Sequence, residues 1–169
     1  MSNLLKKINS CFLIIKQRGF SVLLQAIFHF FLSKFFKIIF FRKIYKRTVN
    51  NYKMFLDLDD RGISRALILF GEREIDQKKI IEECLKPEMC VFDIGANIGY
   101  YVIMESMIMK NKGRIIAIEP SKNNIQLLKQ NLTLNKIVTK DIVISAVVII
   151  SSITSISLYD YGKTNLVTF

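Results

Sequence analysis

The chain has 169 residues, of which 51% are hydrophobic, and its mean hydropathy is +0.30. This composition excludes an intrinsically disordered protein and predicts one domain of ordinary size with room for a short appendage. Residues 1–53 hold eleven Lys or Arg and no acid, so the whole net charge of +11 lies in the N-terminal third and the remainder is neutral.

The few cysteines and the single histidine limit the possible chemistry. Cys11, Cys84 and Cys90 form no CxxC pair, so they predict neither a disulfide framework nor a zinc site. We expect Cys84 and Cys90, which flank a predicted helix-to-strand turn, to be packed thiols in a reducing compartment. His29 is the only histidine, which excludes histidine triads and multi-histidine metal sites, and we expect no bound metal.

Residues 1–50 are predicted to be a basic, apolar helical appendage. Its centre is uncharged from Gly19 to Ser33, and polar side chains recur every fourth residue at Gln25, His29, Ser33 and Lys37. Three placements remain open: a helix lying on an anionic membrane surface, a spanning helix, or a helix packed on the domain or a partner. Basic residues flank both ends, which favours the first and predicts a cytoplasmic protein, peripheral on the inner membrane face.

Residues 51–169 are predicted to form one α/β domain. The expected elements are a strand over 52–58, helices over 63–70 and 76–86, a strand over 89–95, a helix over 98–110, a strand over 112–119, a helix over 121–136 and a strand over 141–150. A core-facing stripe is expected on the second helix, at Ile80, Ile81, Cys84 and Leu85. The alternation of strands and helices predicts a doubly wound parallel sheet that binds ligands at the carboxyl ends of its strands.

The stretch VFDIGANIGYY, residues 91–101, contains the candidate site. Asp93 ends a strand, and Gly95 and Gly99 allow a sharp turn and a close approach of the next helix. The N–H groups of the loop and of the helix start favour an anionic group. Glu119 ends the following strand, where a carboxylate can accept hydrogen bonds from a ribose diol.

The spacing of this loop distinguishes two nucleotide cofactors. A dinucleotide site has glycines in the order G-x-G-x-x-G, whereas this loop reads G-A-N-I-G and follows an acid. Asp93 would repel a pyrophosphate, but it suits the α-ammonium group of S-adenosylmethionine, whose carboxylate the amides would receive. A nicotinamide dehydrogenase is therefore the disfavoured alternative.

The motifs DIGANIGYY, GRIIAIEPS and LLKQNLTLN resemble the FkbM family of S-adenosylmethionine-dependent methyltransferases over roughly residues 52–169. The resemblance implies a Rossmann-like class I methyltransferase fold, S-adenosyl-L-methionine as cofactor, and O-methylation of a sugar or another small-molecule hydroxyl. Glu88 departs from the family, which usually has glycine there. The implied cofactor-binding residues are Asp93, Gly95, Ala96, Asn97, Gly99, Tyr100, Glu119, Pro120 and Ser121.

The acceptor side is less defined. No catalytic base is identified; Glu74 and Asp141 are expected to be solvated or capping carboxylates, and Asn165 is a weak candidate for an acceptor contact. We expect a small-molecule or glycan acceptor and no nucleic acid.

The family's later D-x-E-G segment has no counterpart, so the sheet is expected to be incomplete and the chain a truncated, impaired enzyme. The unpaired edge at Val91 and Phe92 would then invite a partner chain. The alternative is a non-catalytic membrane-associated or partner-binding fragment.

Overall fold

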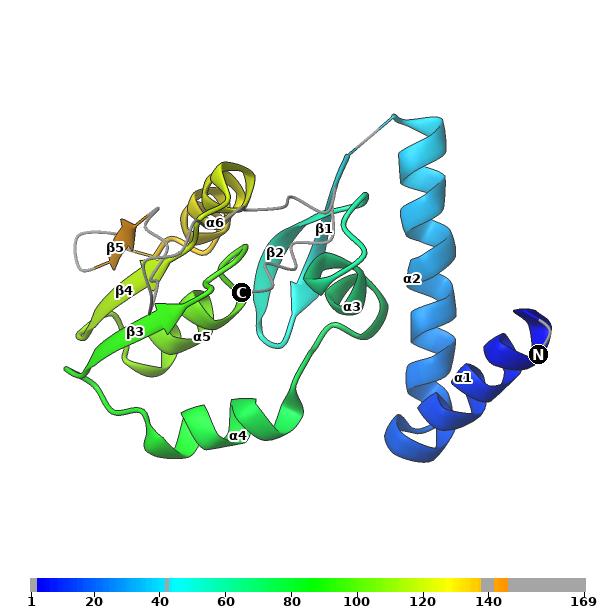
Figure 1. The fold of residues 1–169 in the computed structure, drawn as a ribbon, viewed down its shortest axis with the longest axis horizontal. Coiled ribbons are helices and arrows are strands. Elements are labelled where there is room, and N and C mark those ends of the chain that lie inside the picture. Colours follow the sequence, from blue (N-terminus) through cyan, green and yellow to red (C-terminus); the bar gives the residue numbers. More distant parts are fainter. Residues whose placement is uncertain (1–2, 42, 138–141, 146–169) are drawn as a thin grey trace, which may run out of the picture.

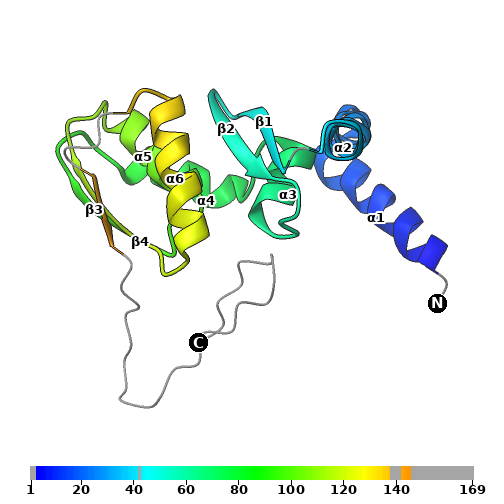
Figure 2. The same ribbon diagram turned by 90° about the horizontal axis from the view of Figure 1, so that it is seen from above.

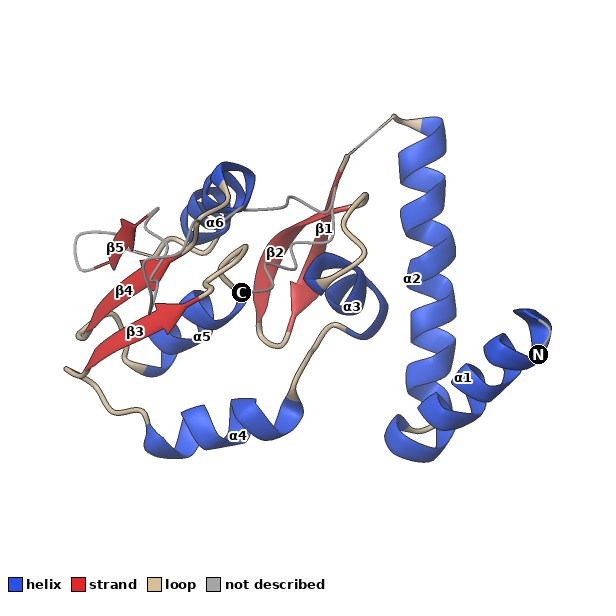
Figure 3. Ribbon diagram, viewed as in Figure 1, coloured by secondary structure: helices blue, strands red, loops and turns tan. Residues whose placement is uncertain are grey.

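A computed structural model of the protein describes residues 3–41, 43–137 and 142–145 (Figures 1 and 3). Its elements are α1 (Asn3–Arg18), α2 (Phe20–Ile39), β1 (Ile44–Val49), β2 (Tyr52–Asp57), α3 (Ile63–Phe70), α4 (Ile75–Cys84), β3 (Cys90–Ile94), α5 (Tyr100–Ile108), β4 (Arg114–Ile118), α6 (Lys122–Leu134) and β5 (Ile142–Ser145). The strands and helices predicted over 52–136 are confirmed within a few residues at each end, and of the strand predicted over 141–150 residues 146–150 lie outside the described residues. The α/β class is confirmed with them.

The larger sheet has the strand order β3-β4-β5, and both pairings are parallel. Asp93 of β3 pairs with Ala117 of β4. Helices α5 and α6 lie together on one face of this sheet (Figure 2). The opposite face of β3 is open, with Phe92 62% and Ile94 66% exposed. Within the described residues β3 has one neighbouring strand, so the sheet is partial there.

A second, antiparallel sheet joins β1 to β2, and the sequence analysis expected no strand before residue 52. Tyr45 and Val49 of β1 are buried together with Met54 and Leu56 of β2. The alternation of buried and exposed residues in IYKRTV is therefore a strand pattern. Because β1 contains basic residues, the sequence analysis assigned it to the basic N-terminal segment, residues 1–50.

Helix α2 turns only the middle of its polar stripe inward, at His29 and Ser33, whereas Gln25 and Lys37 are exposed. Ser33 is buried, His29 Nδ1 lies 3.1 Å from the Tyr45 hydroxyl, and Lys37 forms an ion pair with Asp59. Phe31, on the other side, is 66% exposed. By length and composition alone α2 could cross a membrane, with 20 residues and a mean hydropathy of 1.6. In the structure α2 packs along α3 (Figure 1).

Helix α4 corrects two expectations. It has no buried residue, and Ile80, expected on a core-facing stripe, is 59% exposed. The helix links α3 to β3 along the outside of the fold (Figure 1), so only Ile81 and Leu85 reach the core. Cys11, Cys84 and Cys90 are all exposed, so the prediction of packed thiols is wrong.

Candidate functional site

Two acids lie at the same edge of the parallel sheet. Ile94 pairs with Ile118, so β3 and β4 end side by side. The alternation of side chains places Asp93 and Glu119 on the same face. Burial, and then the charge of Glu119, raises the pKa of Asp93 to about 6. The expected proximity of the two carboxylates is therefore present in the fold.

The loop between β3 and α5 depends on left-handed backbone conformations. Gly95 has φ 82°, Asn97 has φ 50° and Gly99 has φ 87°. A Cβ atom at Gly99 would lie 3.0 Å from Leu128 Cγ of α6. Gly99 therefore meets both needs predicted from the sequence, a turn and a close helix approach.

The loop amides are engaged within the protein. Gly95 and Ala96 both donate to the Ile118 carbonyl, at 2.8 and 3.0 Å, and Gly99 donates to Ala96 O. Asn97 N–H donates to Glu119 Oε2 at 2.9 Å, and Ile98 N–H donates to Asn97 Oδ1. The expectation that loop amides receive an anionic group is thus wrong for this conformation.

Helix α5 supplies the alternative anion site. Its first N–H groups, starting at Tyr100, have no acceptor within the helix, as at every helix start. Gly99 occupies the N-cap position and makes no side-chain cap. An anionic group placed here would receive these N–H groups and the positive end of the helix dipole.

Glu119 is a structural anchor as well as a candidate ligand. It is 4% exposed, and its Oε1 accepts from Ser121 N–H at 2.8 Å and from Asn124 Nδ2 at 3.1 Å. With Asn97 N–H on Oε2, three of its roughly four acceptor positions are filled. One position remains for a ribose hydroxyl. Ser121 also caps α6, and Pro120, between Glu119 and Ser121 in the chain, is half-buried.

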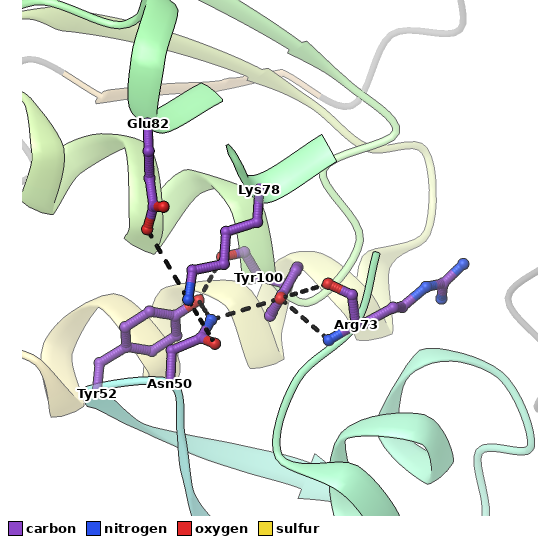
Figure 4. A network of polar contacts seen from close by, with 6 residues as sticks. All are labelled: Asn50, Tyr52, Arg73, Lys78, Glu82 and Tyr100. Carbon is purple, nitrogen blue, oxygen red and sulfur yellow. Dashed lines mark hydrogen bonds and ion pairs between the residues drawn. The ribbon is translucent and has the colours of Figure 1, made fainter. Parts of the chain in front are cut away.

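Tyr100 is a buried connector (Figure 4). Its hydroxyl donates to the Arg73 carbonyl at 2.9 Å and accepts from Arg73 N–H at 3.2 Å. Asn50 Nδ2 lies 3.4 Å from the same oxygen, and the Tyr52 hydroxyl donates to the Tyr100 carbonyl at 3.2 Å. The side chain thus ties α5 to the β1–β2 hairpin and to the segment before α4.

Glu74 is partly exposed and does not cap a helix. It occupies the N-cap position of α4 with φ 50° and makes no cap hydrogen bond. Its Oε1 accepts from Arg73 Nε at 2.9 Å, and its Oε2 accepts from the Tyr101 hydroxyl at 2.5 Å. Asp141 and Asn165, the other acceptor-side candidates, lie outside the described residues.

The sequence analysis missed Glu105 of α5. Its side chain is buried, its Oε2 has no hydrogen-bond partner among the described residues, and neither has Asp93 Oδ2. Burial, and then the charge of Asp93, raises the pKa of Glu105 to about 8. The signal was an acid inside the otherwise apolar helix YYVIMESMI.

These features fit an S-adenosyl cofactor. Asp93 has an unpartnered buried oxygen for a cation, the α5 start offers amides to a carboxylate, and Glu119 retains one acceptor for a ribose. Among the residues that the structure describes, no group of acids, cysteines or histidines could hold a metal ion.

A parallel sheet with a glycine loop between two acid-ended strands defines the class of protein as an α/β domain that binds a nucleotide cofactor at the carboxyl ends of its strands. Comparison with protein families matches residues 56–151 to the TRM5/TYW2 methyltransferase domain. The chain belongs to this family. The predictions of a class I methyltransferase fold, a methyltransferase domain and S-adenosylmethionine as the family's cofactor are confirmed.

Solved structures with a similar fold come mainly from this family. TYW2 of P. horikoshii, in complex with MeSAdo, is 22% identical over 60% of this chain and 35% of its own, with a TM-score of 0.48. M. jannaschii TYW2 in complex with AdoMet is 21% identical over 62% and 43%, with a TM-score of 0.48. The M. jannaschii tRNA m1G37 methyltransferase is 25% identical over 62% and 29%, with a TM-score of 0.43. No curated protein sequence matches.

Family membership corrects three predictions. The family is TRM5/TYW2 and not FkbM. The expected small-molecule or glycan acceptor, with no nucleic acid, is contradicted by the match to the TRM5/TYW2 methyltransferase domain. The cytoplasmic location agrees with such a family, whereas the membrane location finds no support in it. The chain spans about a third of the length of the P. horikoshii relative.

Proposed function

We propose that this chain binds S-adenosylmethionine at the carboxyl edge of β3 and β4, as the cofactor-binding part of an RNA methyltransferase. The observation that carries the proposal is the placement of Asp93 and Glu119 on one face of two adjacent strands, beside the Gly95–Gly99 loop. The cofactor would supply a methyl group activated by its sulfonium. Membership of a methyltransferase family supports this reaction.

Each residue of the proposed site has a separate task. Asp93 would bind the cationic amino-acid end, and the first amides of α5 would receive its carboxylate. Glu119 would accept one ribose hydroxyl while keeping its bond to Asn97. Pro120 and Ser121 would flank the adenosine. Ala96 is buried, and its N–H group donates to the Ile118 carbonyl, which holds the loop against β4.

Titration with two adenosyl compounds tests the cofactor site. We expect S-adenosylhomocysteine and 5′-methylthioadenosine both to bind the wild-type chain, as followed by calorimetry. Glu119→Gln should weaken both at least about tenfold, because the amide group replaces one acceptor with a donor that faces other N–H donors. Glu88→Gln, at an exposed turn, is the matched control. Equal affinities of Glu119→Gln and wild type would remove the ribose assignment.

RNA is the acceptor class that charge and family membership favour. The net charge of +11 suits a polyanion. A groove of about 670 Å³ between α2 and α3 is lined by the basic residues Lys34, Lys37, Arg61 and Arg65. Lys37 pairs with Asp59, and Asp60 accepts from Gly62 and Ser64, so the acids of the groove already have partners.

The salt dependence of RNA binding tests this surface. For the double variant Arg61→Gln/Arg65→Gln we expect weaker binding to a tRNA and a log–log salt slope that is smaller by about 2, because two phosphate contacts are lost. Lys79→Gln, exposed on α4, is the control. Filter binding between low and moderate salt provides the measurement. An unchanged slope would show that RNA does not use the groove.

A further inference from the structure

Helix α5 carries a buried acid that no contact in the described fold explains. Glu105 is 6% exposed, and its Oε2 is buried with no hydrogen-bond partner among the described residues. A carboxyl group in this position costs free energy unless it is protonated or meets a donor. Four of the other buried residues of α5 belong to the hydrophobic core, and Ser106 donates a hydrogen bond to Asn111 Oδ1, so Glu105 is the exception on its own helix.

Asp93 of β3 is in the same situation and interacts with Glu105. Its Oδ2 is also buried without a partner among the described residues. The charged groups that face Asp93 are both acids, Glu105 from α5 and Glu119 from the end of β4. No basic group offsets the rise in the pKa of Asp93 or of Glu105. The described structure thus brings acids together and supplies no cation.

Glu119 differs from these two acids, because its carboxylate already accepts hydrogen bonds from three protein donors. The unsatisfied acceptors therefore belong to Asp93 and Glu105. A group with several N–H donors and a positive charge satisfies such a pair, and an alkylammonium has three donors.

The pair lies close to the N-terminus of α5, and this arrangement suits the two charged groups of an α-amino acid. In an α-amino acid the ammonium and carboxylate groups are attached to one carbon, so their binding sites must adjoin. Asp93 stands two residues before Gly95, and the loop that follows leads directly to the amides at the start of α5. An ammonium at Asp93 and a carboxylate at α5 can therefore belong to one molecule.

We propose that Asp93 and Glu105 together bind the α-ammonium group of the cofactor's amino-acid part. The inference rests on the proposed function and adds Glu105 to the site. Near neutral pH the pair holds one proton, because burial raises the pKa of Glu105 to about 8 and that of Asp93 to about 6. When the ammonium binds, it stabilises both carboxylates, and the proton leaves to the buffer.

Comparing two ligands separates the ammonium site from the adenosine site. S-adenosylhomocysteine carries the α-ammonium, whereas 5′-methylthioadenosine lacks the whole amino-acid end. For Glu105→Gln we expect about tenfold weaker binding of S-adenosylhomocysteine, since one charge-assisted contact is lost. Binding of methylthioadenosine should stay within about twofold of wild type. Glu83→Gln, an exposed position on α4, is the matched control.

Proton release provides a second readout that needs no variant. Calorimetry at pH 7 in two buffers of different ionisation enthalpy should show proton release when S-adenosylhomocysteine binds, and none when methylthioadenosine binds. Glu105→Gln should reduce that release.

The stability of the variant can be checked independently. The folded state favours neutral Glu105, so the unfolded chain binds fewer protons between the ordinary pKa of 4.5 and about 8. Stability therefore falls as pH rises through this window. Glu105→Gln cannot ionise, so we expect it to be at least as stable as wild type at pH 8, as urea denaturation would show.

The possible outcomes distinguish this inference from the proposed function. If the wild-type chain binds neither compound, the proposed cofactor site fails and the ammonium site fails with it. If both compounds bind with equal affinity and no proton is released, the cofactor site stands and the role of Asp93 and Glu105 is overturned. An unchanged affinity ratio in Glu105→Gln overturns the assignment of Glu105 alone.

Discussion

Replacing Asn131 with leucine is expected to lower the free energy of unfolding by about 3–5 kcal/mol. Asn131 of α6 is fully buried. Its Oδ1 accepts from Phe55 N–H at 2.7 Å, and its Nδ2 donates to the carbonyls of Phe55 and Ile98 at 3.2 and 2.9 Å. One side chain therefore connects α6 to β2 and to the end of the glycine loop.

Leucine has a similar size but no polar atoms. Its introduction would leave one N–H group and two carbonyls without their partner, and each unsatisfied buried group costs about 1–3 kcal/mol. Relaxation and water entry would offset part of the sum. Urea denaturation followed by circular dichroism measures the change.

A control on the same helix isolates the buried contacts. Asn123→Leu makes the same replacement at an exposed position near the start of α6. We expect it to change stability by less than about 0.5 kcal/mol. If both variants lost the same stability, helix propensity or solubility would account for the effect, and the three hydrogen bonds of Asn131 would be unimportant.

Asn131 also shows why some contacts of the fold could not be predicted from the sequence. Local periodicity predicts an amphipathic helix over 121–136 and places Leu128 and Leu132 in the core, as observed. No local rule indicates that an asparagine between them bonds a strand 76 residues away. The Tyr100 network with Asn50 and Arg73 has the same origin, because its partners meet only after the hairpin docks.

The candidate site could be predicted in outline because its signals are local. A glycine at a tight turn and an acid at a strand end each have a recognisable spacing, and Gly99 and Asp93 lie where that spacing placed them. Glu88 has φ 73°, a backbone conformation that glycine adopts more readily than other residues. The hydrogen bonds of the loop amides were not predictable, because they depend on Glu119 and Ile118 from another strand.

The same signals could not distinguish the TRM5/TYW2 family from other methyltransferase families. A glycine loop after an acid-ended strand is required by the shared cofactor chemistry, so several methyltransferase families present it. The error over nucleic acid arose because Phe and Ile residues between the N-terminal lysines argued against a phosphate-binding face. In the structure, basic side chains also line the groove between α2 and α3.

Replacing Gly99 with alanine is expected to lower the free energy of unfolding by about 2–4 kcal/mol and to weaken cofactor binding. The residue has φ 87°, which costs an L-residue about 1–2 kcal/mol. Its new Cβ would also lie 3.0 Å from Leu128 Cγ. Leu128 is fully buried, so it cannot move without disturbing the core. A shift of α6 would move Ser121 and Asn124, which hold Glu119.

Gly95→Ala separates the two contributions, because Gly95 has φ 82° but nothing within 4 Å of its Cβ position. The free energy of unfolding of Gly95→Ala should fall by only about 1–2 kcal/mol, the cost of a left-handed backbone conformation for an L-residue. A double-mutant cycle with Leu128→Ala completes the measurement, since removing the leucine relieves the contact and makes the Gly99→Ala penalty smaller in that background. Urea denaturation gives the stabilities and calorimetry gives the affinity for S-adenosylhomocysteine. Equal losses for Gly95→Ala and Gly99→Ala, with no coupling to Leu128, would show that helix α6 does not constrain the loop, and the link between core packing and cofactor geometry would be lost.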